Sequence, residues 1–353
     1  MWYYNPCFLS PGFQFDKFPE CVKLRDLKRR RMGFCFIVGA QRSSKMSMKA
    51  CVFAGQGAQV PGMGSDFAAD AEIADLFTRA NAVLGFDLAK TCFEGPAEEL
   101  TKSNICQPAI FTVSVAAFQA FRKRCPQTAF AMAAGLSLGE WTALHVARVL
   151  DFESALTVLE ARGRFMQQAC EEQASGMISI MGASAEQLQT ICDKTGLSVA
   201  NINSDAQVVL SGLKTGVAAA ATVAAELGVK AIPLNVAGAF HSPFMASARA
   251  KLADVIANIT FHAPTLPVLA NVSGAPHSSD PEAIKDAMLR QVTDSVRWCD
   301  CIRHAIAGGV TTFVEFGPGK VLSGLIKRID KSVATQNVAD TASLDATAAT
   351  CQA

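Results

Sequence analysis

Short apolar runs alternate along this chain with longer stretches in which apolar residues recur at helical spacing. The apolar runs predict buried strands at 50–54, 129–134 and 312–316. The helical stretches are expected near 69–84, 108–124, 153–170 and 321–329. Strands and helices in this alternation are typical of an α/β fold, so we expect a mostly parallel sheet covered by helices on both faces.

The pattern changes between residues 176 and 234. Strands are expected at 177–181, 197–201, 207–211 and 229–234, and helices at 184–194 and 215–227. The resulting order, βαββαβ, is that of a ferredoxin-like subdomain. Because α/β patterning resumes after it, we expect this subdomain to be inserted in the larger domain.

The predicted organisation therefore has four parts. Residues 1–47 are an N-terminal extension outside the fold, and 48–172 together with 237–332 form the large α/β catalytic domain. Residues 173–236 form the small subdomain. Residues 333–353 are small and polar, which predicts a flexible C-terminal tail.

The N-terminal extension is basic, and residues 1–50 hold ten lysines and arginines against three acidic residues. It resembles an organelle targeting peptide, which would send the protein to a mitochondrion or plastid. The alternative is an upstream extension with the real start at Met46 or Met48. We favour the second interpretation, because the segment contains acids and no obvious amphipathic helix, and expect a cytoplasmic protein.

Composition excludes several classes of protein. The formal net charge is only +1 and the part after residue 50 is mildly acidic, which argues against a nucleic-acid binder. The twelve cysteines and five histidines show no zinc-binding spacing, so no metal is expected. No apolar run approaches the ~18 residues of a membrane span, so no membrane partner is expected.

The stretch Gly135–Gly139 reads Gly-Leu-Ser-Leu-Gly, the G-x-S-x-G pattern of a nucleophile elbow. An apolar strand precedes it and a helix-compatible stretch with Glu140 in its first turn follows. This strand–turn–helix context is that of a hydrolase-like core, with Ser137 at the tip of the turn. A plain turn would explain the five residues alone, but not their flanks.

A serine nucleophile needs a base, and His241 is the best placed of the five histidines. It follows directly on the inserted subdomain, where the chain returns to the main domain and a cleft is expected. A helix cap or a core position would explain the same histidine equally well.

Arg162 lies on a predicted helix with apolar neighbours, which indicates a buried face. A buried guanidinium is costly unless it meets an anion, and it binds a carboxylate in a planar, bidentate way. The alternative is a surface ion pair with Glu160 or Glu171.

An oxyanion hole needs two backbone N–H donors. The residue after the nucleophile, Leu138, supplies one, and the loop Gly55–Gly57 can supply the other. That loop lacks the spacing of a nucleotide-binding glycine loop, so no nucleotide is expected.

Five motifs in this order resemble the malonyl-CoA:acyl-carrier-protein transacylases, the stand-alone acyltransferases of type II fatty acid synthesis. The resemblance covers about residues 49 to 330. The motifs are FAGQGAQ at 53–59, GLSLGE at 135–140, RGRFMQ at 162–167, AFHSPFM at 239–245 and EFGPGKVL at 315–322. The chain departs from the family at Leu136, where histidine is more common, and at Ala54, where proline is common.

The resemblance implies a role for each matching residue. Ser137 would be the nucleophile and His241 the general base, oriented by the backbone carbonyl of Gln291. Gln56 and Leu138 would donate the oxyanion-hole N–H groups.

The resemblance also implies how the acyl group is chosen. Arg162 would bind the free carboxylate of malonate, and the pocket would be lined by Phe240, Met166 and Asn203. Phe240 resembles the malonyl type of acyltransferase domain, because a bulky ring crowds a branching methyl group.

The implied reaction is ping-pong transfer of malonyl from malonyl-CoA, through a Ser137 ester, to the thiol of holo acyl carrier protein. It needs no cofactor, and the protein is expected to be a monomer. Two alternatives remain, a serine esterase or thioesterase with the same elbow and a catalytically silent scaffold of a synthase assembly.

Overall fold

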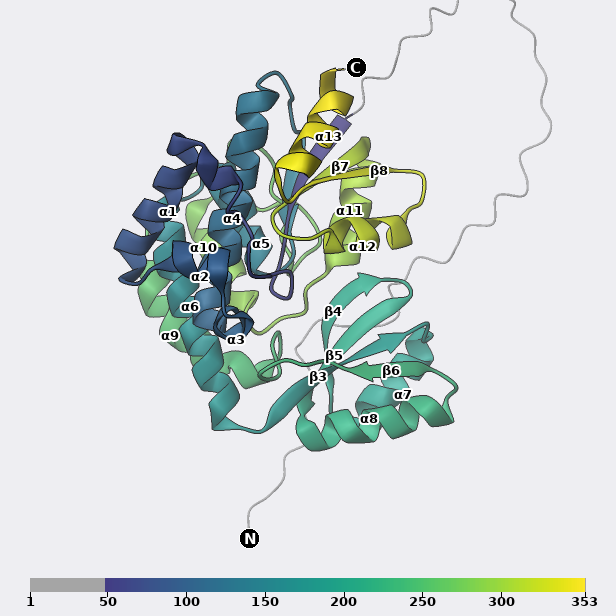
Figure 1. The fold of residues 1–353 in the computed structure, drawn as a ribbon. Coiled ribbons are helices and arrows are strands. Elements are labelled where there is room, and N and C mark those ends of the chain that lie inside the picture. Colours follow the sequence, from purple (N-terminus) through teal and green to yellow (C-terminus); the bar gives the residue numbers. More distant parts are fainter. Residues whose placement is uncertain (1–47, 353) are drawn as a thin grey trace, which may run out of the picture. The chain divides into compact units, whose positions relative to one another are not determined.

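The computed structural model describes residues 48–352; the predicted extension 1–47, with its two interpretations, lies outside the described residues. A parallel sheet in the order β2-β1-β7-β8 forms the centre of the larger part (Figure 1). Its strands are β1 (Met48–Phe53), β2 (Met132–Gly135), β7 (Val310–Phe316) and β8 (Ala334–Val338).

Alternate residues of β1 enter two different hydrophobic clusters. Ala50 and Val52 pack with α11 (Trp298–Ala307) and α12 (Val321–Ile329) on one face, while Cys51 and Phe53 join the larger cluster around α4 (Ser103–Arg124). The two-residue period of a strand thus places helices on both faces of the sheet. The predicted α/β fold class is confirmed.

The longest helix, α4, is the one described helix that is long and apolar enough to cross a membrane by length and composition. The sequence pattern predicted no apolar run of that length. In the fold, 83% of the most apolar 18-residue stretch of this helix is buried. Its apolar surface therefore packs inside the protein, as in a core helix.

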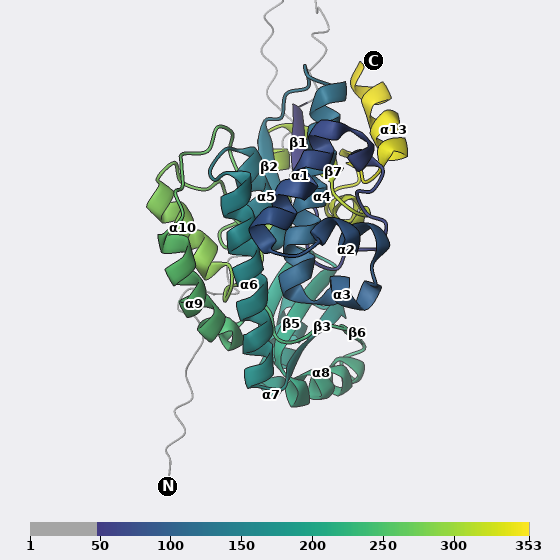
Figure 2. The same ribbon diagram turned by 60° about the vertical axis from the view of Figure 1, so that its left-hand side comes forward.

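Helix α4 also packs against α5 (Leu138–Val146) and α6 (Phe152–Glu172), and α9 (Ala246–Ala257) packs against α6. Further helices of the larger part are η2 (Phe67–Ala69), α1 (Ala71–Leu84), α2 (Leu88–Glu94), α3 (Ala97–Thr101), η3 (Pro243–Met245) and α10 (Pro281–Arg290). Figure 2 shows α6 running beside α9.

A second sheet is antiparallel, in the order β4-β5-β3-β6. Its elements follow one another in the predicted βαββαβ order: β3 (Ser175–Met181), α7 (Ala185–Thr195), β4 (Ser198–Ser204), β5 (Gln207–Leu213), α8 (Lys214–Glu226) and β6 (Lys230–Pro233). Helices α7 and α8 cover one face of this sheet (Figure 1), where Ile178 and Ile180 pack against them.

Two segments without regular structure extend these sheets and bring distant parts of the chain together. Val268 pairs in parallel with Ala133 of β2, and Val296 pairs in parallel with Asn201 of β4. The first pairing places Asn271 beside the end of β2, where the elbow begins.

The prediction of a flexible tail from residue 333 is wrong. Strand β8 pairs with β7 over its whole length, and α13 (Thr341–Gln352) follows it. Val338 and Ala348 are buried there. The tail is ordered because β8 forms backbone hydrogen bonds with β7 and because Val338 and Ala348 pack into the main hydrophobic core.

Candidate active site

Ser137 stands at the turn between β2 and α5 with φ 55° and ψ −104°. A positive φ is costly for a residue with a side chain and is typical of a nucleophile elbow. The turn is tight because glycines lie on both sides. A Cβ at Gly135 would lie 1.9 Å from the carbonyl carbon of Gly139, and one at Gly139 would lie 2.1 Å from the oxygen of Phe53.

The serine hydroxyl meets the predicted histidine. Ser137 Oγ lies 2.8 Å from His241 Nε2, and His241 Nδ1 lies 2.8 Å from the backbone oxygen of Gln291. With the Nδ1 proton donated to that carbonyl, Nε2 is free to accept the serine proton. Ser137, His241 and Gln291 are all buried. The structure thus brings together three of the residues that the sequence nominated.

The histidine is held in its neutral form. Burial, with a smaller effect of the Arg162 charge, lowers the pKa of His241 to about 4, while its bond to the Gln291 carbonyl acts in the opposite direction. A neutral imidazole is the form that can act as a base.

Arg162 of α6 points inward, so the alternative of a surface ion pair is wrong; Arg164 pairs with Glu160 instead. Its Nη1 donates to Oε1 of Gln107 at 2.6 Å. Its Nη2 donates to Ser137 Oγ and to Oε1 of Gln291, both at 3.0 Å.

These acceptors are neutral, and among the described residues Nε of Arg162 has no hydrogen-bond partner. Burial lowers the pKa of Arg162 to about 10, against the effect of Glu140, so the guanidinium is still charged at neutral pH. A buried cation without a directly bonded carboxylate is suited to an anionic group that arrives from outside.

The two predicted oxyanion donors lie just beyond the ends of two neighbouring strands. Gln56 follows β1, and Leu138 is the first residue of α5. Within residues 48–352, no hydrogen bond engages the backbone N–H of either residue. An N–H at a helix N-terminus has no partner within its helix and is available to an anion.

A family model for the acyl transferase domain matches residues 50–348. The chain belongs to the acyl transferase family.

Relatives of this acyl transferase domain cover most of its length. The chain is 41% identical over 290 residues to a protein of Escherichia coli K12 named malonyl CoA-acyl carrier protein transacylase, covering 80% of this chain and 93% of that protein. An acyl carrier protein S-malonyltransferase from Vibrio cholerae superimposes with a TM-score of 0.82 at 39% identity, covering 85% of this chain and 100% of that one.

A further solved structure is described as a type II PKS acyl-carrier protein in complex with its malonyl-transacylase. It matches with a TM-score of 0.83 at 38% identity and covers 86% of this chain and 100% of that one. The predicted resemblance is confirmed.

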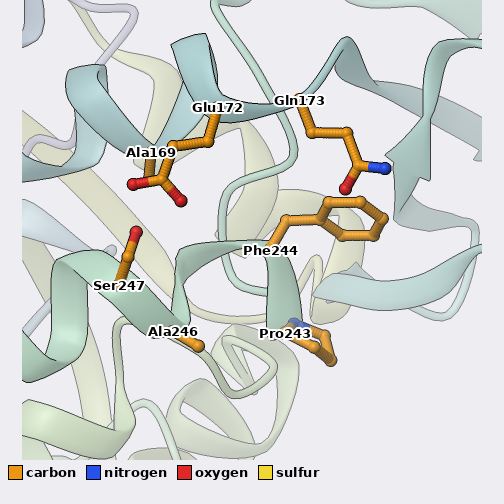
Figure 3. Close-up of a pocket in the computed structure, with 7 residues that line it drawn as sticks. All are labelled: Ala169, Glu172, Gln173, Pro243, Phe244, Ala246 and Ser247. Carbon is orange, nitrogen blue, oxygen red and sulfur yellow. The ribbon is translucent and has the colours of Figure 1, made fainter.

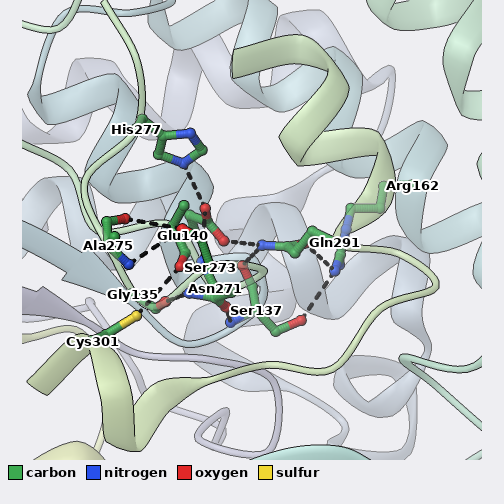
Figure 4. A network of polar contacts seen from close by, with 11 residues as sticks. Gly135, Ser137, Glu140, Arg162, Asn271, Ser273, Ala275, His277, Gln291 and Cys301 are labelled. Carbon is green, nitrogen blue, oxygen red and sulfur yellow. Dashed lines mark hydrogen bonds and ion pairs between the residues drawn. The ribbon is translucent and has the colours of Figure 1, made fainter. Parts of the chain in front are cut away.

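Beneath the nucleophile of this acyl transferase lies a buried polar network that sequence reasoning missed (Figure 4). Asn271 accepts the Ser137 N–H through Oδ1 at 2.7 Å and donates from Nδ2 to the oxygen of Gly135 at 2.8 Å. Gln291 Nε2 donates to the oxygen of Ser137 at 2.9 Å and to Glu140 Oε2 at 2.5 Å. The side chain of Gln291 is thus part of the site, in addition to its backbone carbonyl.

The predicted pocket residues have different surroundings. Met166 is buried, and its Sδ lies 3.8 Å from Nε2 of Gln107, the partner of Arg162. Phe240 is buried in the main core next to His241. Asn203 lies on β4, and its Oδ1 is buried with no partner among residues 48–352. No described hydrogen bond joins Asn203 to Ser137, so its pocket role stays a prediction.

A hollow of about 440 Å³ lies beside the segment that follows His241. It is lined by Ala169, Glu172 and Gln173 at the end of α6 and by Pro243, Phe244, Ala246 and Ser247 of η3 and α9 (Figure 3). It does not include Ser137. In the described part of the chain, no cluster of three or more His, Cys, Asp or Glu side chains could hold a metal ion.

Proposed function

We propose that this protein transfers the malonyl group from malonyl-CoA to the phosphopantetheine thiol of holo acyl carrier protein, supplying fatty acid elongation. One observation carries the proposal: the hydroxyl of Ser137 lies within hydrogen-bonding distance of both a neutral imidazole and a buried guanidinium. The names of the relatives at about 40% identity support the same transfer.

In the first half-reaction, Ser137 Oγ attacks the thioester carbonyl carbon while His241 Nε2 takes the hydroxyl proton. The negative charge that develops on the carbonyl oxygen would be stabilised by the N–H groups of Gln56 and Leu138. The C–S bond then breaks, and the leaving CoA sulfur takes the proton from His241. The product is a malonyl ester on Ser137.

In the second half-reaction, His241 removes the proton from the phosphopantetheine thiol of the carrier. The thiolate attacks the malonyl ester, the C–O bond breaks, and Ser137 regains its proton. The chemistry is thioester to ester and back, so these side chains and backbone donors suffice and we propose that no cofactor takes part. The relative solved with an acyl carrier protein supports the carrier as partner.

Arg162 would determine which acyl group is loaded onto Ser137. The free carboxylate of malonate would replace neutral acceptors such as Gln107 Oε1 and reach the Nε that has no partner among the described residues. An acetyl group offers no such charge. We therefore expect Ser137 to be acylated faster by malonyl-CoA than by acetyl-CoA. Only the malonyl group gains a buried, charge-assisted hydrogen bond.

The test is intact-mass analysis after incubation with malonyl-CoA, followed by addition of holo carrier protein. We expect one malonyl group on the wild type, none on Ser137→Ala, and quantitative transfer of the adduct to the carrier. Free malonate released at the same rate with or without carrier would indicate a thioesterase or esterase instead. A protein that is never acylated would be a catalytically silent scaffold.

A further inference from the structure

The buried network continues beyond Gln291 to a carboxylate–imidazole pair that the proposed reaction does not use. Glu140 Oε1 lies 2.6 Å from His277 Nε2, and the side chains of both residues are 1% exposed. The same Oε1 accepts the backbone N–H of Asn271 at 3.2 Å. Glu140 therefore contacts both Asn271, which holds the elbow, and Gln291, which contacts the arginine.

The other carboxylate oxygen determines how the Gln291 amide is oriented. Gln291 presents its NH₂ group to Glu140 Oε2, at 2.5 Å, and a carboxylate oxygen is an acceptor for such a donor. The amide oxygen then necessarily faces Arg162, whose Nη2 donates to it at 3.0 Å. If the amide turned over, its NH₂ group would face the guanidinium, and two donors would oppose each other.

The position of Glu140 suits a fixed negative charge. It lies in the first turn of α5, where the helix dipole favours an anion. Among the described residues it is also the acidic side chain whose charge acts on Arg162, and one amide lies between the two (Figure 4). His277 is the only described side chain other than Gln291 that donates a hydrogen bond to this carboxylate.

We infer that Glu140 and His277 are positioning residues for acyl-group selection. His277 fixes the carboxylate, the carboxylate fixes the Gln291 amide, and the amide holds Arg162 where the substrate carboxylate must bind. This inference rests on the proposed function. It assigns a role to a histidine that lies 137 residues from Glu140 in the chain and outside all five sequence motifs.

The matched variants are His277→Gln, which keeps a side-chain N–H donor, and His277→Leu, which has similar bulk and no donor. The measurement is the rate of Ser137 acylation by malonyl-CoA and by acetyl-CoA, with thermal unfolding of each variant. We expect His277→Leu to lower the malonyl-to-acetyl ratio roughly tenfold, because a hydrogen bond to a charged group is lost. Acetyl loading should fall less than malonyl loading, and His277→Gln should restore most of the ratio.

A purely structural role would lower the melting temperature and leave the ratio as in the wild type, and that result in folded His277→Leu overturns the inference. Equal losses in His277→Gln and His277→Leu overturn it as well. If His277→Leu does not fold, Glu140→Asp replaces it, since the shorter carboxylate cannot reach both Gln291 and His277; an unchanged ratio there is equally decisive. A wild type that accepts no malonyl would instead refute the proposed function.

Discussion

Arg162 Nη2 lies 3.0 Å from Ser137 Oγ, so the proposed selector of the acyl group already contacts the proposed nucleophile. Because the guanidinium can only donate, the serine oxygen must accept from it, which leaves the hydroxyl proton for His241 Nε2 at 2.8 Å. The arginine thereby fixes the direction in which the serine proton is transferred. It also lowers the pKa of the histidine that receives this proton.

Removing the guanidinium should change the preference for malonyl over acetyl more than it changes the rate of acylation itself. We expect Arg162→Ala to lower malonyl loading about 100-fold, because charge-assisted hydrogen bonds to the carboxylate are lost, while acetyl loading falls far less. Arg162→Lys is the control, since it keeps the charge without the planar pair of donors. Single-turnover loading from the two thioesters measures both rates; equal losses would refute the carboxylate role.

The rate of acylation should change little as the pH falls from neutral to mildly acidic. Because burial and the Arg162 charge lower the pKa of His241 to about 4, the imidazole stays neutral well below its ordinary value of 6.5. We expect the rate constant of acylation to be level from neutral pH to about pH 5 and to fall below that. Quenched-flow mass analysis across this range would check it.

The Arg162→Ala variant provides the control for this pH dependence. Since one cause of the low pKa of His241 is then removed, the acid limb should move towards higher pH. A limb that stays in place would mean that the guanidinium charge does not act on the histidine.

The free energy of unfolding should also depend on pH through His241. Below pH 6.5 the unfolded chain binds a proton on this imidazole, whereas the folded protein does not until about pH 4. Stability is therefore lost as pH falls, by roughly 2 kcal/mol at pH 5. Urea unfolding of wild type and His241→Gln at pH 7.5 and pH 5 isolates this contribution, and a constant difference between them would contradict it.

Glycine substitutions should have opposite effects at the elbow and in a surface helix. At Gly135 a methyl group would meet backbone atoms at 1.9–2.4 Å, so Gly135→Ala should prevent folding of the elbow and abolish acylation. Gly324 lies inside α12 with nothing within 4 Å of an added Cβ. Gly324→Ala should therefore raise the free energy of unfolding by about 0.5–1 kcal/mol, measured by chemical denaturation.

The C-terminal helix should behave as part of the core. Ala348 is buried and its neighbour Ala349 is exposed, which makes them a matched pair. Ala348→Asp should cost several kcal/mol, because an unpaired carboxylate is buried, while Ala349→Asp stays within about 0.5 kcal/mol of the wild type. Equal melting temperatures would show that α13 contributes nothing to stability.

The sequence by itself determined those features that depend on near neighbours in the chain. The elbow requires Gly135 and Gly139 four residues apart, and the strand alternation at β1 follows from the two faces of a sheet. The βαββαβ order was predictable for the same reason. The residues themselves indicated His241 and Arg162, with other interpretations left open. The resemblance gave both a role and added the Gln291 carbonyl. The structure places His241 and Arg162 at Ser137 and the Gln291 carbonyl at His241.

Only the tertiary structure decided which distant side chains support this site. Asn271 reaches Ser137 across 134 residues, Gln107 reaches Arg162 across 55, and His277 reaches Glu140 across 137. Such contacts leave no local pattern in the sequence. A buried polar group needs a hydrogen-bond partner nearby in the fold, and that partner can lie at any distance along the chain. The tail from residue 333 follows the same rule. Its small polar residues carry no strand signal, and β8 forms because the edge of β7 supplies the hydrogen bonds.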